Sequence, residues 1–257
     1  MKTPSDMAEK SFSGPEDLAL IRCRELYDLI TNFASQQSIL DFYNWFDELN
    51  SIYQNYPDNK EILEILAKTL KNSIKLFGDR KFFADMLNLL DNLEKISDKN
   101  PQFEIISEYL AEAISTSIYN LRGSWDVEGT SSLLERIKLL VRNNNDNKTI
   151  LLHQARSYSN AISRFCSDRH NFTCDKLLFE LRMFANRYRE DVDIQIEFAQ
   201  ALTNVVGTLA RENRSDELKQ VLAELTKVVA RFPNDEKMQL LLTRSTILSS
   251  IANNPKE

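Results

Sequence analysis

Glycine and proline are scarce in this chain, which has only five Gly and six Pro among 257 residues. Folds built from strands and tight turns need these residues at many positions, so their scarcity favours long helices. Long apolar runs are missing too, since no stretch approaches the roughly 18 apolar residues of a membrane span. We therefore expect a helical protein with no membrane partner.

An excess of positive charge is also lacking, because the formal net charge is −6. Phosphate backbones are bound by basic surfaces, so we expect no nucleic-acid partner. The composition is 42% hydrophobic and 27% charged, which is ordinary for a folded domain with a buried core. Residues 1–14 are polar and lack the apolar segment of a secretory signal, so we expect a flexible tail and a cytoplasmic protein.

Cysteine is rare, and the three residues Cys23, Cys166 and Cys174 contain no CxxC motif. An odd set of this kind predicts free thiols in a reducing compartment. Cys166 and Cys174 flank His170 at four-residue steps, and such side chains are zinc ligands. Both cysteines also fit buried columns of the repeat described below, and no fourth ligand is evident. We therefore favour core packing and expect no metal site.

Enzyme motifs are missing as well. The sequence has no glycine-rich phosphate loop, no GxSxG and no HExxH. The two histidines, His153 and His170, leave little room for a histidine-based triad. Acid–base chemistry would have to use carboxylates such as Glu64, Glu108 and Glu112, which are more simply a solvated helix face. We expect no enzyme, no catalytic residues and no cofactor.

A period of 44 residues organises what is present. When Ile62 is taken as the first core residue of a helix, an apolar residue recurs every 44 positions. The equivalent residues are Leu18, Ile62, Ile106, Ile150, Ile194 and Met238. A fixed period of this size indicates stacked repeats. The prediction is an all-α, right-handed α-α superhelix (solenoid) of five helical hairpins over 18–61, 62–105, 106–149, 150–193 and 194–237, with a last helix over 238–252 and a tail over 253–257.

Each repeat is predicted to contain a helix A, a short loop and a helix B, because apolar residues recur at steps of three and four. The fifth position of helix A is small in every repeat. Its residues are Cys23, Ala67, Ala111, Ala155 and Ala199. Small side chains indicate close approach of neighbouring helices. Asp58 and Glu61 predict a capping box, and Gly78 and Gly123 predict helix C-caps.

Leu66-Ala67-x-x-Leu70 recurs as Leu110-Ala111-x-x-Ile114 and Phe198-Ala199-x-x-Leu202, and Pro57, Pro101 and Pro233 follow their B helices. In these features nearly the whole chain resembles the tetratricopeptide repeat family. The family's period is about 34 residues and its helix A carries a Trp that is absent here. We interpret the chain as a tetratricopeptide-like solenoid with lengthened helices. HEAT or armadillo repeats, of about 40–47 residues, are the alternative label.

The resemblance implies that helix A lines the concave face, where α-solenoids bind their partners. Two columns on that face are polar, one rich in cations and one rich in asparagine. The candidate residues for binding a protein or an extended peptide are Arg24, Lys68, Arg156 and Arg244 in the first column, and Asp28, Asn72, Asn160 and Asn204 in the second. Amides can bridge a peptide main chain, and cations favour acidic groups. A solvated polar face is the plainer interpretation of each residue alone.

The last predicted helix is more apolar than a capping helix should be. It carries Leu240, Leu241, Leu242, Ile247, Leu248 and Ile251. Two classes of function follow: an adaptor that binds protein or peptide, and alternatively a structural subunit that self-associates through 238–252. Gly207 lies inside a predicted helix, where glycine costs about 1 kcal/mol relative to alanine. Close approach of a ligand or a helix, or neutral drift, would each account for it.

Overall fold

The computed structural model describes residues 14–33, 39–121, 127–144, 146–167 and 171–253. Within these ranges the chain forms helices and no strand. The helices are α1 (Pro15–Thr31), α2 (Ile39–Asn55), α3 (Lys60–Asp79), α4 (Phe83–Lys99), α5 (Glu104–Asn120), α6 (Val127–Asn143), α7 (Lys148–Ser167), α8 (Asn171–Arg187), α9 (Val192–Arg211), α10 (Ser215–Val229) and α11 (Glu236–Asn253). The tails predicted over 1–14 and 253–257 lie almost wholly outside the described residues.

The helix boundaries repeat as regularly as the sequence. All even-numbered helices begin 44 residues apart, at residues 39, 83, 127, 171 and 215. The odd-numbered helices do the same from α3 onward, beginning at 60, 104, 148, 192 and 236. The predicted all-α class and solenoid arrangement are confirmed.

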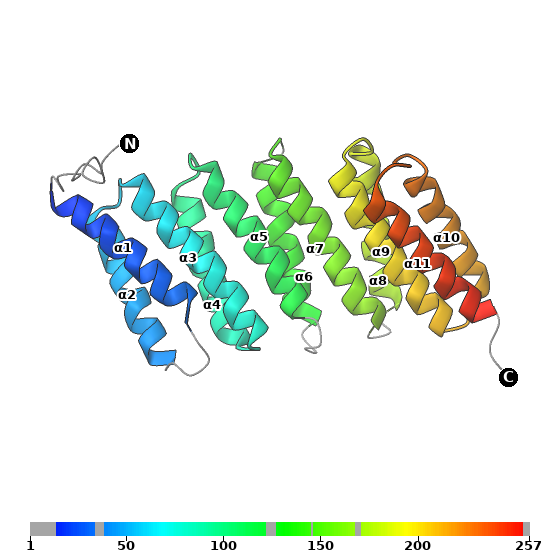
Figure 1. Cartoon of the computed structure of the whole chain (residues 1–257), viewed down its shortest axis with the longest axis horizontal. Helices are drawn as coiled ribbons and strands as arrows, with labels where there is room; N and C mark the ends of the chain where they lie inside the picture. The colour runs from blue at the N-terminus through cyan, green and yellow to red at the C-terminus, as the bar shows by residue number, and fades with distance from the viewer. Residues whose placement is uncertain (1–13, 34–38, 122–126, 145, 168–170, 254–257) are drawn as a thin grey trace, which may run out of the picture.

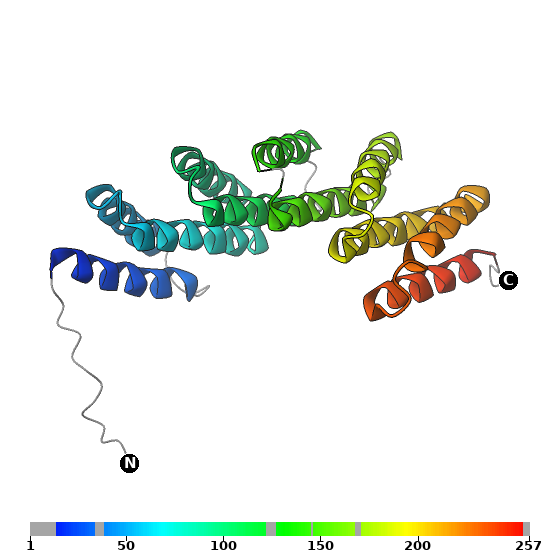
Figure 2. The same cartoon turned by 90° about the horizontal axis from the view of Figure 1, so that it is seen from above.

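The helices form two unequal layers (Figure 1). Each odd helix packs against the next odd helix, from α1 to α11. Each even helix packs against its odd neighbours, and within the described residues no two even helices pack directly against each other. The molecule is an arch in which the odd helices form the concave side and the even helices stand on the outer side, as Figure 2 shows. Helix A of each predicted repeat therefore lines the concave side, as expected.

Close packing within the odd row explains the column of small residues. Cys23, Ala67, Ala111, Ala155 and Ala199 are completely buried. A larger side chain at any of these positions would push two packed helices apart. The odd row therefore carries the continuous core, to which the even helices are attached one by one.

Side chains bridge the outer helices where their backbones do not meet. Three ion pairs join residues 42 positions apart on successive even helices. They are Glu94–Arg136 at 2.7 Å, Lys138–Glu180 at 2.8 Å and Arg182–Glu224 at 2.6 Å. These ion pairs connect successive outer helices through their side chains, although the described parts of these helices do not pack against one another.

The predicted capping box at Asp58 is wrong by one residue. Asn59 is the N-cap of α3, and its Oδ1 accepts a hydrogen bond from the backbone N–H of Ile62 at 3.0 Å. The equivalent residues in later repeats accept the same bond at α7, α9 and α11. They are Asn147, Asp191 and Asp235. The side-chain cap thus recurs with the repeat, in the position that satisfies an otherwise unpaired helix N–H.

Gly78 is not the helix C-cap that was predicted, because it lies inside α3. A Cβ at Gly78 would overlap the side chain of Asn120 on α5, so the glycine permits close helix contact. Among the described non-glycine residues, two are left-handed: Lys81, with φ 64°, and Asn213, with φ 56°, which follow odd helices at equivalent repeat positions. Gly123 lies outside the described residues.

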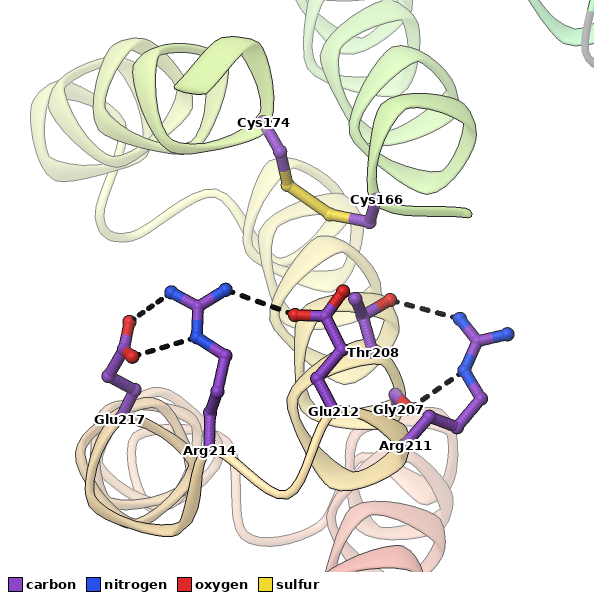
Figure 3. A network of polar contacts seen from close by, with 8 residues as sticks. All are labelled: Cys166, Cys174, Gly207, Thr208, Arg211, Glu212, Arg214 and Glu217. Carbon is purple, nitrogen blue, oxygen red and sulfur yellow. Dashed lines mark hydrogen bonds and ion pairs between the residues drawn. A yellow bond between two sulfur atoms is a disulfide. The ribbon is translucent and has the colours of Figure 1, made fainter. Parts of the chain in front are cut away.

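The prediction of free thiols is wrong for two of the three cysteines. Cys166 and Cys174 form a disulfide that joins the end of α7 to the first turn of α8, with Cα atoms 5.7 Å apart (Figure 3). Both are buried, as their columns predicted, and Cys23 is buried and free. The packing of α7 against α8 brings the pair together, which their spacing alone does not reveal. None of the described helices combines the length and apolar character that crossing a membrane requires.

Candidate peptide-binding face

The concave face consists of the accessible residues of the odd helices. Even helices cover the outer side of the odd row, and neighbouring odd helices cover its flanks. Accessible side chains in the middle of the row therefore point to the concave side. All eight predicted residues belong to odd helices and are exposed or partly exposed. The exposed ones are Arg24, Asp28, Lys68 and Arg244, and the partly exposed ones are Asn72, Arg156, Asn160 and Asn204.

Two cations of the first column are neutralised by the next odd helix. Arg24 on α1 pairs with Glu61 on α3 at 3.1 Å. Arg156 on α7 pairs with Glu197 on α9 at 3.1 Å. These pairs connect neighbouring repeats, and their charges are largely compensated before any ligand arrives.

The other two cations of the column have no acidic partner among the described residues. The Nζ of Lys68 lies over the ring of Tyr27, 5.3 Å from its centre, in a cation–π contact. Arg244 on α11 is exposed, and no described side chain pairs with it. Arg244 is therefore the predicted cation most open to an anionic ligand.

The asparagines of the second column also contact neighbouring helices. Asn72 donates from Nδ2 to the hydroxyl oxygen of Tyr27 at 3.1 Å, and Asn160 donates to the backbone carbonyl of Ser115 at 3.3 Å. In both, Oδ1 has no hydrogen-bond partner in the described part of the chain. These two side chains tie successive odd helices together and keep an acceptor available.

Asn204 is oriented the other way. Its Oδ1 accepts a hydrogen bond from Gln200 Nε2 at 3.3 Å. Its Nδ2 has no partner among the described residues, so two N–H donors stay available. Asp28 is exposed at the start of the column, and only its backbone carbonyl accepts a hydrogen bond, from Asn32. The predicted ladder is thus not made of equivalent members.

A pocket of about 510 Å³ opens between α1 and α3. This N-terminal pocket is lined by Arg24, Tyr27, Glu61, Glu64, Ile65 and Lys68. It contains two cations and two acids, and its formal charges balance. Glu64 also accepts a hydrogen bond from the Tyr109 hydroxyl at 3.3 Å. Arg24 and Glu61 pair with each other within this pocket, and Glu64 is bonded to Tyr109 outside its lining.

A second pocket, of about 280 Å³, lies between α7, α9 and α11. This C-terminal pocket is lined by Ser163, Thr203, Asn204, Gly207, Thr208, Arg211, Arg244 and Leu248. No Asp or Glu is among the described residues that line it. Sequence reasoning identified Asn204 and Arg244 but missed Arg211, because the equivalent residue two repeats earlier is Gly123 and no column pattern marks the position.

Of the residues considered for metal binding or histidine-based chemistry, His153, Cys166 and Cys174 line neither of these two pockets. His153 on α7 is buried, and burial lowers its pKa to about 4, with Arg156 contributing in the same direction. The Cys166–Cys174 disulfide leaves neither sulfur as a thiolate ligand, and His170 lies outside the described residues. Among the residues that the structure describes, no group of three His, Cys, Asp or Glu is placed to hold a metal ion.

Comparison of the chain with protein-family models, with curated proteins and with solved structures finds no match. The helical-repeat assignment therefore rests on the helix arrangement and the 44-residue period. The candidate site rests on the geometry of the concave face.

Proposed function

We propose that this chain is a non-enzymatic helical-repeat adaptor that binds an extended peptide of a partner protein on its concave face. One observation carries the proposal: the predicted residues Asn204 and Arg244 meet, together with Arg211, in an acid-free pocket on that face. Unpaired donors gathered in a concave surface are what recognition of a peptide's polar groups requires.

The spacing of the asparagines suits an extended chain. Helices in contact lie 8–10 Å apart, so successive repeats advance by roughly 10 Å. An extended peptide advances about 3.3 Å per residue, so one side chain per repeat meets about every third peptide residue. Asn72 and Asn160 offer acceptors and Asn204 offers donors. A peptide main chain supplies the complementary N–H and C=O groups.

The test uses peptides selected from a random library by the purified chain, with affinity measured by fluorescence anisotropy. The double variant Asn204→Ala, Arg244→Ala should weaken binding at least tenfold, because a charged and a neutral hydrogen bond are lost. A matched control is Lys219→Ala, Lys227→Ala, which changes exposed residues of α10 on the outer side. Equal affinity of the double variant and the control would contradict the proposal.

We further infer that the chain is a tetratricopeptide-like solenoid with lengthened repeats, which the helix A pattern and the position of helix A on the concave side support. HEAT-type repeats remain the alternative, since 44 residues is closer to their length. Cytoplasmic localisation remains a prediction. One argument for the cytoplasm was that all three thiols are free, as in a reducing compartment. The Cys166–Cys174 disulfide removes that argument.

A structural subunit is the second candidate, and α11 favours it. Leu240, Ile247 and Ile251 are 67%, 53% and 63% exposed. Their spacing of seven and four places them on one side of the helix. A second copy of the chain packed there would bury this stripe. Light scattering over a range of concentrations, with Ile247→Asp as the comparison, tests it, and a monomer at every concentration would argue against self-association.

A further inference from the structure

Two arginines near the end of α9 have opposite surroundings, as Figure 3 shows. Arg214 is held between two acids: Nε donates to Glu217 at 2.8 Å, and a terminal nitrogen pairs with Glu212 at 3.2 Å. Arg211 has no acidic partner in the described part of the chain. The charge of Arg214 is therefore neutralised, whereas that of Arg211 is not.

Arg211 is nevertheless held in place by its own helix. Its Nε donates to the backbone carbonyl of Gly207 at 3.2 Å, and a terminal nitrogen donates to Thr208 Oγ1 at 3.1 Å (Figure 3). A guanidinium group has five N–H donors. The remaining donors stay available at the wall of the C-terminal pocket, and their orientation is fixed before a ligand binds. Such preorganisation lowers the entropic cost of binding.

Arg244 and Asn204 complete the donor set from two helices. Arg244 on α11 has no ion pair among the described residues, and Asn204 on α9 has both Nδ2 protons available. Two positive charges thus share one pocket without a described acid in its lining, in a chain whose net charge is −6. Such an arrangement attracts an anion with several acceptor oxygens.

Gly207 gives the pocket its space. A Cβ there would meet only Leu248 Cδ1, at 3.6 Å, which is an ordinary contact. Packing of α9 against α11 therefore does not require a glycine, although glycine costs about 1 kcal/mol in a helix interior. Because Gly207 lines the pocket, an added methyl group would occupy volume that a ligand needs. Of the explanations open to the sequence, close approach of a helix does not fit, whereas space for a ligand and neutral drift both do.

We propose that the C-terminal pocket is an oxyanion site, in which Arg211, Arg244 and Asn204 bind a carboxylate or phosphoryl group carried by the partner peptide. The source of the anion rests on the proposed function, whereas the pocket itself is testable with free anions. Two guanidinium groups can donate several charge-assisted hydrogen bonds to one such group. A phosphoryl group, with about −1.5 to −2 charge and three acceptor oxygens, would be bound more tightly than a carboxylate.

The direct test is a titration of the whole chain with inorganic phosphate, and separately with acetate, at constant ionic strength. Side-chain nitrogen signals are followed by NMR. Saturable shifts are expected for Arg211 and Arg244 Nε–H and for Asn204 Nδ2–H, with tighter binding of phosphate. Arg214 serves as an internal control whose signal should stay in place. Equal, non-saturating shifts of all arginine signals would mean general ionic attraction and would overturn the proposal.

Two variants separate the pocket from the fold. Arg244→Gln should weaken phosphate binding about tenfold, and Lys219→Gln on α10 should leave it unchanged. Gly207→Ala should weaken binding several-fold while the melting temperature stays equal or rises, because alanine favours the helix. Unchanged phosphate affinity in both Arg244→Gln and Gly207→Ala would overturn the site.

Peptide probes identify the source of the anion and distinguish the two proposals. One library-selected peptide is made with Ser, Glu or phosphoserine at each position in turn, and with a free or amidated C-terminus. A gain from one anionic form that Arg244→Gln abolishes supports the pocket and names its ligand. Peptide binding that no anionic form improves and Arg244→Gln leaves intact would remove the pocket but keep the adaptor. Saturable phosphate binding without any peptide binding would keep the anion site and remove the adaptor.

Discussion

The two pockets of the concave face share the column of Arg24, Lys68 and Arg244 but differ in charge. The N-terminal pocket places Arg24 and Lys68 beside Glu61 and Glu64, so its charges cancel. The C-terminal pocket places Arg211 and Arg244 among neutral side chains. One end of the arch therefore carries a pocket whose formal charges balance, and the other end carries a pocket lined by cations without a described acid.

The difference follows from how the repeats neutralise one another. Two cations of the first column pair forward with an acid on the next odd helix, Arg24 with Glu61 and Arg156 with Glu197. Lys68 instead lies over the ring of Tyr27. Arg244 lies on α11, which no described helix follows. The charge of Arg244 has no described acid beside it, and a site in a repeat protein can arise where a cation of such a column lacks this partner.

The largest expected effect comes from acid, which acts on the stability of the fold through His153, a buried residue of α7 in the middle of the odd row. The pKa of His153 is lowered by burial from 6.5 to about 4. Between these two pH values the imidazole of His153 is protonated in the unfolded chain but neutral in the folded chain. The folded chain therefore keeps its full stability above pH 6.5 and loses stability as the pH drops towards 4. The loss should reach about 3 kcal/mol.

Urea denaturation at pH 7 and at pH 4.5 measures this loss, with His153→Gln as the comparison. Lys71 and Glu112 are the other charged groups that act on the imidazole, and Arg156 opposes its protonation. The variant should lose less stability over this range than the natural chain. Identical pH dependence of the two would mean that His153 is not the responsible group.

The next effect comes from giving the C-terminal pocket the acid that it lacks. Asn204→Asp keeps the shape of the side chain and places a carboxylate beside Arg211 and Arg244. Phosphate affinity should fall about 30-fold, or about 2 kcal/mol, because the two cations are neutralised internally. The NMR titration measures it, and Asn204→Ala, which should lose less affinity, separates charge from the loss of a donor.

Gly78 on α3 and Gly207 on α9 lie in opposite halves of the row of odd helices, and the space around them differs. Gly78→Ala would overlap Asn120 and should destabilise the chain by about 1–2 kcal/mol, since the steric cost exceeds the helix gain. Gly207→Ala meets no such obstacle and should stabilise it by up to about 1 kcal/mol. Urea denaturation measures both. In an Asn120→Ala background the cost of Gly78→Ala should shrink but not vanish, because the Cβ of residue 120 would still lie 2.9 Å from the new methyl group. An unchanged cost would place the obstacle elsewhere.

The smallest effect is a gain of function at the opposite end. Glu61→Gln with Glu64→Gln removes both acids from the N-terminal pocket and leaves Arg24 and Lys68 uncompensated. Weak phosphate binding, with a dissociation constant in the millimolar range, should appear at Arg24, because no oriented second guanidinium group is present there. Absence of any new shift would show that unpaired charge alone does not make the site.

Much of the fold could be predicted because the residues that recur every 44 positions are the ones that helix packing requires. The apolar columns and the small column at Ala67 and Ala199 predict which helices touch and how closely. The residues that cap the helices and the role of Gly78 were harder to predict. Asn59 rather than Asp58 caps α3, and Gly78 serves packing with Asn120 rather than a turn, because both depend on contacts that the local sequence does not contain.

The candidate site was only partly predictable for a similar reason. A column identifies which residues share a face, so Asn204 and Arg244 could be found. It cannot reveal that Asn72 is bonded to Tyr27, that Arg156 is paired with Glu197, or that Arg211 joins the pocket from the end of its helix. The disulfide between Cys166 and Cys174 likewise depends on how the hairpin closes.

The central claim is that a partner peptide lies on the concave side of the odd row. Photo-crosslinking tests it most directly: a library-selected peptide with a photoreactive residue is bound to the whole chain, and the crosslinked positions are mapped by mass spectrometry. The account predicts crosslinks on the concave residues of α7, α9 and α11, near Asn204 and Arg244. Crosslinks confined to the outer side, for example at the exposed Phe179 and Met183 of α8, would contradict it.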